Sequence, residues 1–332
     1  TDYTIEPINN YREGFTIKFN HPISTKVDIE YKTKFDPNYF NAHDITNHGK
    51  LTWLENGVSY EREDSATVSS DRYTKNNGNK TGTYNPKTKT ITWIIDVNYN
   101  LQEINQAVIK DFYQGEQTFV KESLKVNRLN LQGGADQVEV KEELPSSAYS
   151  FEGGLKNSEG HEGFALTFKD PIDSAYRITY QTSLKGHEVL AEYMNDATMS
   201  DGGGPALFAQ SASVKPKHGG EYILKQGKQG TGADAENAFW TIYLNRNQSW
   251  IDAGAKVTDK LSDNQVLLPE SFQLYQTVVD ANGVVSKGEP ADPADYELKV
   301  LTPADGEHSF ELIFKKPIES AYILEYKSFI IA

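Results

Sequence analysis

Hydrophobic and polar positions alternate along most of the chain, which predicts short β-strands separated by turns. The alternation forms one series of strands that returns later in the same order, at 90–98, 107–111 and 123–126 and then at 239–245, 255–259 and 271–274. Trp93 and Trp240 lie 147 residues apart, and Asp111 and Asp259 lie 148 apart. One type of domain is therefore expected to occur more than once.

A second repeated block occurs three times. In each copy a Phe is followed 16 residues later by a Tyr, with a Pro-Ile pair between them, at Phe15 and Tyr31, Phe164 and Tyr180, and Phe310 and Tyr326. Frequent turn signals and the lack of helical periodicity accompany these strands. Together they predict an all-β chain of tandem immunoglobulin-like antiparallel β-sandwiches.

The positions of the domain boundaries stay open at this stage. The chain has 332 residues, enough for two to three domains that each bury a core. In one division of the chain into repeats, residues 1–71 are the C-terminal part of a repeat, 72–215 are a complete sandwich, and 216–332 are a further repeat that need not be complete. The alternative division has units at 1–149 and 150–296. Sequence does not choose between them, because a sandwich repeat can be cut at any loop.

Composition excludes several classes of function. The net charge of −14 argues against a nucleic-acid or anionic-membrane partner. No cysteine is present, which excludes disulfides and thiolate chemistry. No apolar run approaches the ~18 residues of a membrane span, and we expect no signal segment at the N-terminus. The seven His lack metal-ligand spacing, so no metal and no cofactor are expected.

Two polar residues fall on the apolar faces of predicted strands. Asp111 shares its face with Ala107 and Ile109, and Asn195 shares its face with other small or apolar residues, including Ala197. A buried carboxylate and a buried carboxamide need polar partners, because an unpaired buried group is costly. A buried lysine could satisfy both.

Such a trio could react with itself. Burial lowers the pKa of a lysine and raises that of an aspartate, so a neutral amine and a neutral acid can coexist. The amine would attack the Asn carbonyl, with the Asp as acid and base, and ammonia would leave. We predict Lys80 as the nucleophile, Asp111 as the acid and base, and Asn195 as the acceptor; Lys87 or Lys89 could replace Lys80.

Partial sets occur elsewhere in the chain. Lys228 and Asp259 are the predicted equivalents of Lys80 and Asp111, and Asn47 is the predicted equivalent of Asn195. The alternative interpretation is structural: Asp111 could accept backbone hydrogen bonds at the end of a turn, and Lys80 could be solvated.

These motifs resemble the collagen-adhesin family of Gram-positive surface proteins. The resemblance is carried by 80–82, 92–93, 96–98, 109–111, Gln117, 123–126, 178–182 and Asn195. It implies variant immunoglobulin domains with intramolecular Lys–Asn isopeptide bonds and a catalytic Asp. It also implies a secreted, cell-wall-anchored segment that binds a host extracellular-matrix protein such as collagen or acts as a locked stalk.

Two other classes of function are alternatives to the one that this resemblance implies. A glycan-binding module of a secreted enzyme would present Trp and Tyr rings as a flat, exposed platform. A turnover enzyme would need a nucleophile–His–acid set or a metal cluster, and the sequence shows neither. The chain is therefore expected to be no enzyme, apart from a single self-modification.

Overall fold

The computed structural model describes residues 2–33, 44–133, 137–301 and 309–331. It divides into two compact units, residues 1–39 and 40–332. The second unit contains two β-sandwiches and a hairpin, and the first contains another hairpin. The prediction of an all-β chain with tandem antiparallel sandwiches is confirmed.

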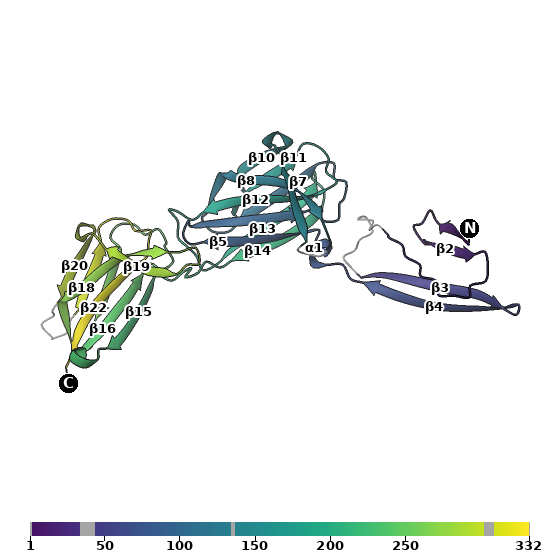
Figure 1. Ribbon diagram of the computed structural model, residues 1–332. Coiled ribbons are helices and arrows are strands. Elements are labelled where there is room, and N and C mark those ends of the chain that lie inside the picture. Colours follow the sequence, from purple (N-terminus) through teal and green to yellow (C-terminus); the bar gives the residue numbers. More distant parts are fainter. Residues whose placement is uncertain (1, 34–43, 134–136, 302–308, 332) are drawn as a thin grey trace. The chain divides into compact units, whose positions relative to one another are not determined.

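The first sandwich consists of two five-stranded antiparallel sheets (Figure 1). One sheet has the order β10 (Tyr149–Lys156), β11 (Glu162–Phe168), β7 (Ala107–Tyr113), β13 (Tyr193–Asp201), β14 (Ala206–Val214). The other has the order β5 (Gly78–Asn85), β6 (Thr90–Val97), β12 (Ala175–Ser183), β8 (Thr118–Leu131), β9 (Val138–Glu143).

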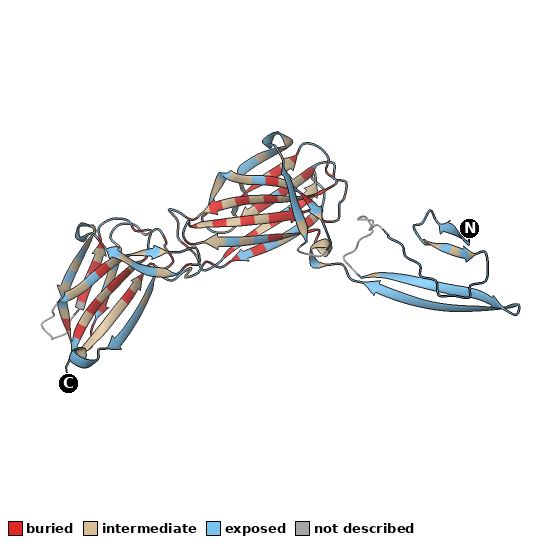
Figure 2. Ribbon diagram, in the orientation of Figure 1, coloured by how far each residue is buried: buried red, intermediate tan, exposed pale blue. Residues whose placement is uncertain are grey.

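Alternation along the strands fills the space between these sheets. In β6, every second residue from Ile91 is buried, and Trp93 is completely enclosed. The Trp93 indole donates a hydrogen bond to the hydroxyl of Thr182 at 3.1 Å. Figure 2 shows this pattern as buried positions alternating along the strands of the sandwich. Trp93 is therefore a core residue.

The second sandwich has the same strand arrangement as the first, except that its smaller sheet has three strands where the first sandwich has five. Its larger sheet has the order β15 (Ile223–Gln229), β16 (Asn237–Leu244), β22 (Tyr322–Ile330), β18 (Gln265–Val279), β19 (Val285–Pro290). Its smaller sheet has the order β17 (Lys256–Lys260), β21 (Ser309–Phe314), β20 (Tyr296–Leu301). In the described residues no strands correspond to β13 and β14 in this sandwich.

Two hairpins precede the sandwiches in the chain. The first pairs β1 (Tyr3–Ile8) with β2 (Gly14–Phe19), and the second pairs β3 (Ile45–Glu55) with β4 (Val58–Val68). The rings of Phe15 and Tyr31 meet edge to face at 4.9 Å. Phe164 with Tyr180, and Phe310 with Tyr326, do the same at 5.0 and 5.1 Å. The 16-residue spacing thus encodes one aromatic contact three times.

Short helical turns join the strands. One α-helix, α1 (Arg72–Lys75), is described, and the sequence pattern did not predict it because it has only four residues. Asp71 caps it by accepting backbone hydrogen bonds from Tyr73 and Thr74. The 3₁₀ turns η1 (Ser146–Ala148) and η3 (Pro293–Asp295) precede β10 and β20, and η2 (Gly232–Asp234) precedes β16.

Candidate functional site

Four strands of the first sandwich bring four polar side chains into its core. Lys80 comes from β5 and Tyr180 from β12 in one sheet, and Asp111 comes from β7 and Asn195 from β13 in the other. Each lies on the inward face of its strand, and all four residues are buried. The strand alternation that predicted burial of Asp111 and Asn195 is confirmed by the structure.

A continuous chain of contacts links the four groups across the core. The Lys80 amine contacts the Asp111 carboxylate oxygen Oδ2, and both side chains have no exposed surface. The Tyr180 hydroxyl donates to the other carboxylate oxygen at 2.6 Å. The Asn195 amide nitrogen donates to the Tyr180 hydroxyl at 2.7 Å. These polar contacts thus link the two sheets across the core.

The carboxamide oxygen of Asn195 is buried and has no hydrogen-bond partner among the described residues. Buried oxygens are normally satisfied, because leaving one unsatisfied costs about 1–3 kcal/mol. This oxygen belongs to the carbonyl that the predicted reaction would polarise. A proton donor aimed at it during the reaction would satisfy it.

Burial sets the protonation of the two ionisable groups. It lowers the pKa of Lys80 and raises the pKa of Asp111, and their mutual attraction offsets these shifts only in part. The pKa of Tyr180 lies well above its ordinary value, again chiefly because of burial. Both shifts are in the direction of a neutral amine beside a neutral acid.

The walls of the site are apolar and aromatic. The Lys80 amine lies 5.6 Å from the ring centroid of Trp93, and Phe164 packs edge to face on Tyr180 at 5.0 Å. Water is kept from the amine by these rings, so its protonated form gains little from solvation. A neutral amine in such a place is a nucleophile held beside an acid.

The two alternative lysines lie elsewhere. Lys87 is exposed in the turn between β5 and β6. Lys89 is buried, but its amine pairs with Glu319 at 2.7 Å. Of the three predicted candidates, the structure brings Lys80 to Asp111.

In the second sandwich the partner of Asp259 is Lys225, so the assignment of Lys228 is corrected. The Lys225 amine lies 2.8 and 2.6 Å from the two carboxylate oxygens of Asp259. Lys228 is exposed. The Tyr326 hydroxyl contacts the same carboxylate, as Tyr180 contacts Asp111.

The misassignment has a simple origin in the sequence. Residues 225–230 contain the triplet Lys-Gln-Gly twice, and both copies resemble the Lys-Thr-Gly at 80–82. Gly82 pairs with Trp93, and Gly227 pairs with Trp240. A Cβ on either glycine would come within 2.4 Å of that indole ring. The first triplet is therefore the one that corresponds to residues 80–82, because its glycine pairs with the tryptophan. Lys228 lies three residues after Lys225 on the same strand, so it is on the opposite face.

Asn47 lies on β3 and is exposed, opposite Ala66 of β4. Asn195 has the same relation to Ala212 of β14. The structure does not bring Asn47 to Lys225 or Asp259.

Tyr180 and Tyr326 were missed as site residues by the sequence reasoning. The signal was present, because the 16-residue spacing places a Tyr at the same point of every copy. The spacing by itself indicates only repeated architecture, whereas in both sandwiches the hydroxyl also contacts the aspartate.

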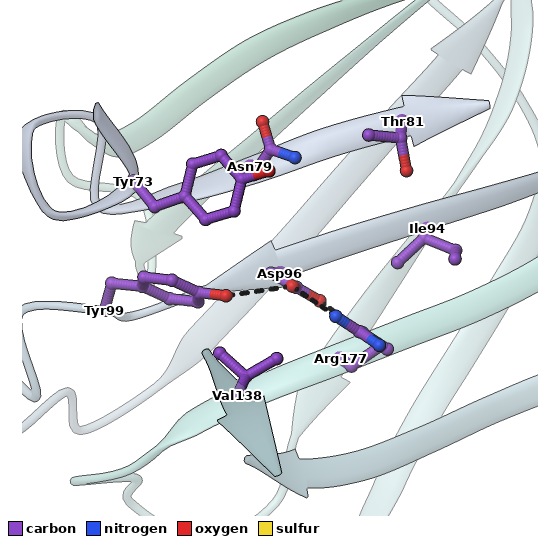
Figure 3. A pocket seen from close by; sticks show the side chains of 8 residues that line it. All are labelled: Tyr73, Asn79, Thr81, Ile94, Asp96, Tyr99, Val138 and Arg177. Carbon is purple, nitrogen blue, oxygen red and sulfur yellow. Dashed lines mark hydrogen bonds and ion pairs between the residues drawn. The ribbon is translucent and has the colours of Figure 1, made fainter. Parts of the chain in front are cut away.

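A separate hollow of about 140 Å³ lies on the other face of the sheet that carries β5, β6 and β12. Arg177 binds both carboxylate oxygens of Asp96 at 2.7 and 2.8 Å, and the Tyr99 hydroxyl donates to Asp96 at 3.0 Å. The rings of Tyr73 and Tyr99 meet edge to face at 5.8 Å. Figure 3 shows these groups around the hollow, together with Val138 from β9.

The described part of the chain holds no group of three or more His, Asp or Glu arranged to bind a metal ion. None of its helices has the length and apolar character that crossing a membrane would require.

Comparison with known proteins gives one match that bears on identity. The family model described as "Collagen binding domain" matches residues 75–203 and 221–331, more than half of the chain. No curated protein matches the chain.

Solved structures show weaker similarity. The collagen binding subdomain of the Enterococcus faecalis surface protein ACE is 14% identical, with a TM-score of 0.30 over 42% of this chain and 97% of that one. The collagen-binding domain from a Staphylococcus aureus adhesin is 16% identical, with a TM-score of 0.29 over 42% and 97%. The C-terminal domain of the Streptococcus agalactiae AgI/II polypeptide BspA is 14% identical, with a TM-score of 0.29 over 86% and 92%. Similarity at this level supports no argument beyond the family match.

Proposed function

The chain belongs to the collagen binding domain family, and from that premise we propose that it is a segment of a bacterial cell-surface adhesin whose first sandwich is locked by an internal amide bond. The lock joins Lys80 of β5 to Asn195 of β13. The observation that carries this proposal is the buried contact of Lys80 with Asp111, which Tyr180 extends to Asn195.

The reaction uses groups that the chain already holds. The neutral amine of Lys80 attacks the side-chain carbonyl carbon of Asn195, while protonated Asp111 polarises the carbonyl oxygen. A new C–N bond forms and the original amide C–N bond breaks. The amine proton passes through Asp111 to the leaving nitrogen, and one molecule of ammonia departs. No turnover follows, because the product remains in the core.

The bond would stabilise the sandwich in two ways. It closes a loop of about 115 residues, which by analogy with disulfide loops contributes on the order of 4–5 kcal/mol. It also ties β5 in one sheet to β13 in the other, so that tension on the chain cannot separate the sheets. Such a tie suits a surface tether under shear.

We further propose that the repeat runs over residues 72–215, with 1–71 and 216–332 belonging to neighbouring repeats. In support, all ten strands of the two complete sheets fall within 72–215, and the lock would join strands inside that range. The division with units at 1–149 and 150–296 would place these strands in two domains.

We propose that the ligand is collagen or a similar host matrix protein. The adhesin would bind it outside the cell, as a secreted protein attached to the cell wall. The hollow beside Arg177 suits such a ligand. Collagen chains have the polyproline II conformation, whose rings dock in grooves lined by aromatic side chains and whose carbonyls accept hydrogen bonds. Tyr73 and Tyr99 supply rings there, and Arg177 supplies donors.

The alternative of a glycan-binding module has little support. Trp93 is fully buried, and Trp240 is half-buried with its indole bonded to Ser328 at 2.9 Å. Neither ring offers the exposed platform that this alternative requires.

Two measurements test the proposed function separately. Intact mass of the purified chain should fall short of the sequence mass by one ammonia, and Lys80→Met should restore it. An unmodified mass would remove the lock and leave the adhesin proposal standing. Binding to immobilised collagen should weaken at least tenfold in Tyr73→Ala but not in Tyr275→Ala, a matched change in the second sandwich. Equal binding by both variants would remove the hollow as the ligand site.

A further inference from the structure

A set of hydrogen bonds runs from the core tryptophan of the first sandwich to the loop that follows β7. The Trp93 indole donates to the Thr182 hydroxyl at 3.1 Å, and that hydroxyl donates to the carboxamide oxygen of Gln117 at 2.6 Å. The amide nitrogen of Gln117 donates to the backbone carbonyl of Gln114 at 2.7 Å. Trp93, Thr182 and Gln117 are all buried, and together they form the indole network.

The second sandwich contains the same network. The Trp240 indole donates to the Ser328 hydroxyl at 2.9 Å, and that hydroxyl donates to the carboxamide oxygen of Gln265 at 2.7 Å. The amide nitrogen of Gln265 donates to Ser262, three residues earlier in the chain. The middle residue changes from Thr to Ser, which removes a methyl group and keeps the hydroxyl. The feature that both copies share at this position is therefore the pair of hydrogen bonds.

The indole network has a fixed place relative to the reactive residues. In both sandwiches the Gln follows the aspartate by six residues, at 111–117 and 259–265. The hydroxyl residue follows the tyrosine by two, at 180–182 and 326–328. Side chains two apart on a strand lie on the same face, so the hydroxyl faces the core next to the tyrosine that contacts the aspartate.

The tryptophan that this network holds is a wall of the reactive site. The Lys80 amine lies 5.6 Å from the centroid of the Trp93 ring, and Gly82 lies against the face of the ring, where a Cβ would collide with it. The indole has a single hydrogen-bond donor and no acceptor. Its bond to Thr182 therefore fixes which edge of the ring is directed toward β12.

The other end of the network is tied to the strand of the acceptor. The backbone N–H of Gln114 donates to the carbonyl of Met194 at 2.9 Å, and Met194 directly precedes Asn195 on β13. The loop 114–117 thus connects the sheet that carries Asn195 with the sheet that carries Trp93. Hydrogen bonds therefore link the acceptor strand to the wall beside the amine.

We propose that Gln117 and Thr182 are positioning residues for the amide bond of the first sandwich. They hold the Trp93 ring beside the Lys80 amine, and the ring keeps water from the amine until it reacts with Asn195. Neither residue transfers a proton, and both act through the indole. The proposal rests on the internal lock proposed above.

The charges around the amine explain why this shield is needed. Burial is the largest influence on the pKa of Lys80 and lowers it, whereas Asp111 on β7 and Asp196 on β13 raise it. Tyr180 on β12 contacts Asp111 and completes the titratable groups of the site. A ring that moved away would admit water, and the pKa of Lys80 would rise toward its ordinary value. The amine would then stay protonated up to a higher pH.

The test follows the loss of ammonia after refolding, by intact mass, at a series of pH values. Thr182→Val keeps the shape of the side chain and removes the hydroxyl. We expect this variant to react about tenfold more slowly at neutral pH and to move the acid limb of the rate profile to higher pH. Thr182→Ser introduces the residue of the second sandwich and should keep the rate and profile of the wild type.

A second variant breaks the network at its other end, and a control leaves it whole. Gln117→Met removes the acceptor of the Thr182 hydroxyl and should move the acid limb in the same direction. Gln181→Leu is the matched control, because Gln181 lies on the outward face of β12 and donates to the Thr92 hydroxyl at 3.0 Å. It loses a side-chain hydrogen bond on the same strand and should leave the rate and profile unchanged.

The outcomes separate this proposal from the internal lock. A wild-type chain that never loses ammonia would overturn both. If the wild type reacts, and Thr182→Val or Gln117→Met only lowers the melting temperature without moving the acid limb, the positioning role alone is overturned. Where one variant does not fold, the other decides. Failure of both to fold, with Thr182→Ser folded, would show that the network serves the fold and would overturn the proposal as well.

Discussion

The two sandwiches carry a corresponding lysine, aspartate and tyrosine, but the lysine is fully buried only in the first. Lys80 and Asp111 have no exposed side-chain surface, whereas Lys225 is 36% exposed. In the first sandwich the hairpin β13–β14 extends the sheet beside β7, and no counterpart lies among the described residues of the second. The comparison teaches that the surrounding strands, more than the identity of the partner residues, decide how far the lysine is buried.

The physical reason is desolvation. Burial is the largest influence on the pKa of Lys80 and of Asp111, lowering the first and raising the second. In the second sandwich the Lys225 side chain is 36% exposed and forms an ion pair with Asp259. The enclosed pair in the first sandwich is the one for which we propose the reaction.

The largest expected effect is on how far the chain extends when it is pulled. With Lys80 joined to Asn195, the residues between them cannot extend under force. Lys80→Met should release about 400 Å of additional chain length on unfolding. Single-molecule stretching measures this directly, and Lys225→Met should release no additional length in a monomer. Equal extension of wild type and Lys80→Met would show that Lys80 is not joined to Asn195.

A large effect on thermal stability is expected from Asp111→Ala. Without the acid the bond does not form, and the loop-closure contribution of about 4–5 kcal/mol is lost. The melting temperature of the first sandwich should fall by more than about 10 °C. Asp259→Ala should leave that transition in place in calorimetry of the monomer. A fall of the same size in both variants would show that the two aspartates have the same role.

An intermediate effect is expected from pH. The reaction needs Lys80 without its proton and Asp111 with one, and burial shifts each pKa toward that state. The rate of ammonia loss after refolding should fall in acid, where the amine is protonated, and in base, where the acid ionises. Timed samples analysed by intact mass give this profile. A rate that rises steadily with pH would show that Asp111 acts without its proton.

The smallest effect is expected from Tyr180→Phe. Its hydroxyl donates to Asp111 and accepts from Asn195, so it positions both groups. Loss of these hydrogen bonds should slow the reaction about tenfold without preventing it. Tyr326→Phe should leave the rate unchanged in the first sandwich. The ring packing is retained in both variants, which separates positioning from folding.

Much of the fold could be predicted because period-2 alternation fixes which face of a strand is buried. That rule placed Asp111 and Asn195 in the core before their partners were known. The chosen nucleophile, Lys80, sits in a polar, Gly-rich segment where alternation is weak. Its inward direction follows from pairing with β6, where Gly82 meets Trp93.

Other features escaped the sequence for identifiable reasons. The doubled Lys-Gln-Gly triplet at 225–230 made Lys228 and Lys225 indistinguishable until Trp240 fixed the register. The role of Tyr180 depends on a contact between two sheets: the 16-residue spacing marks the tyrosine but does not identify its partner on the other sheet.

Peptide mapping of the purified chain tests the central claim most directly. After proteolysis, mass spectrometry should recover one branched peptide that joins the segments around Lys80 and Asn195 and is lighter than their sum by one ammonia. Fragmentation should place the branch at those two side chains. Recovery of both segments as separate, unmodified peptides would contradict the account.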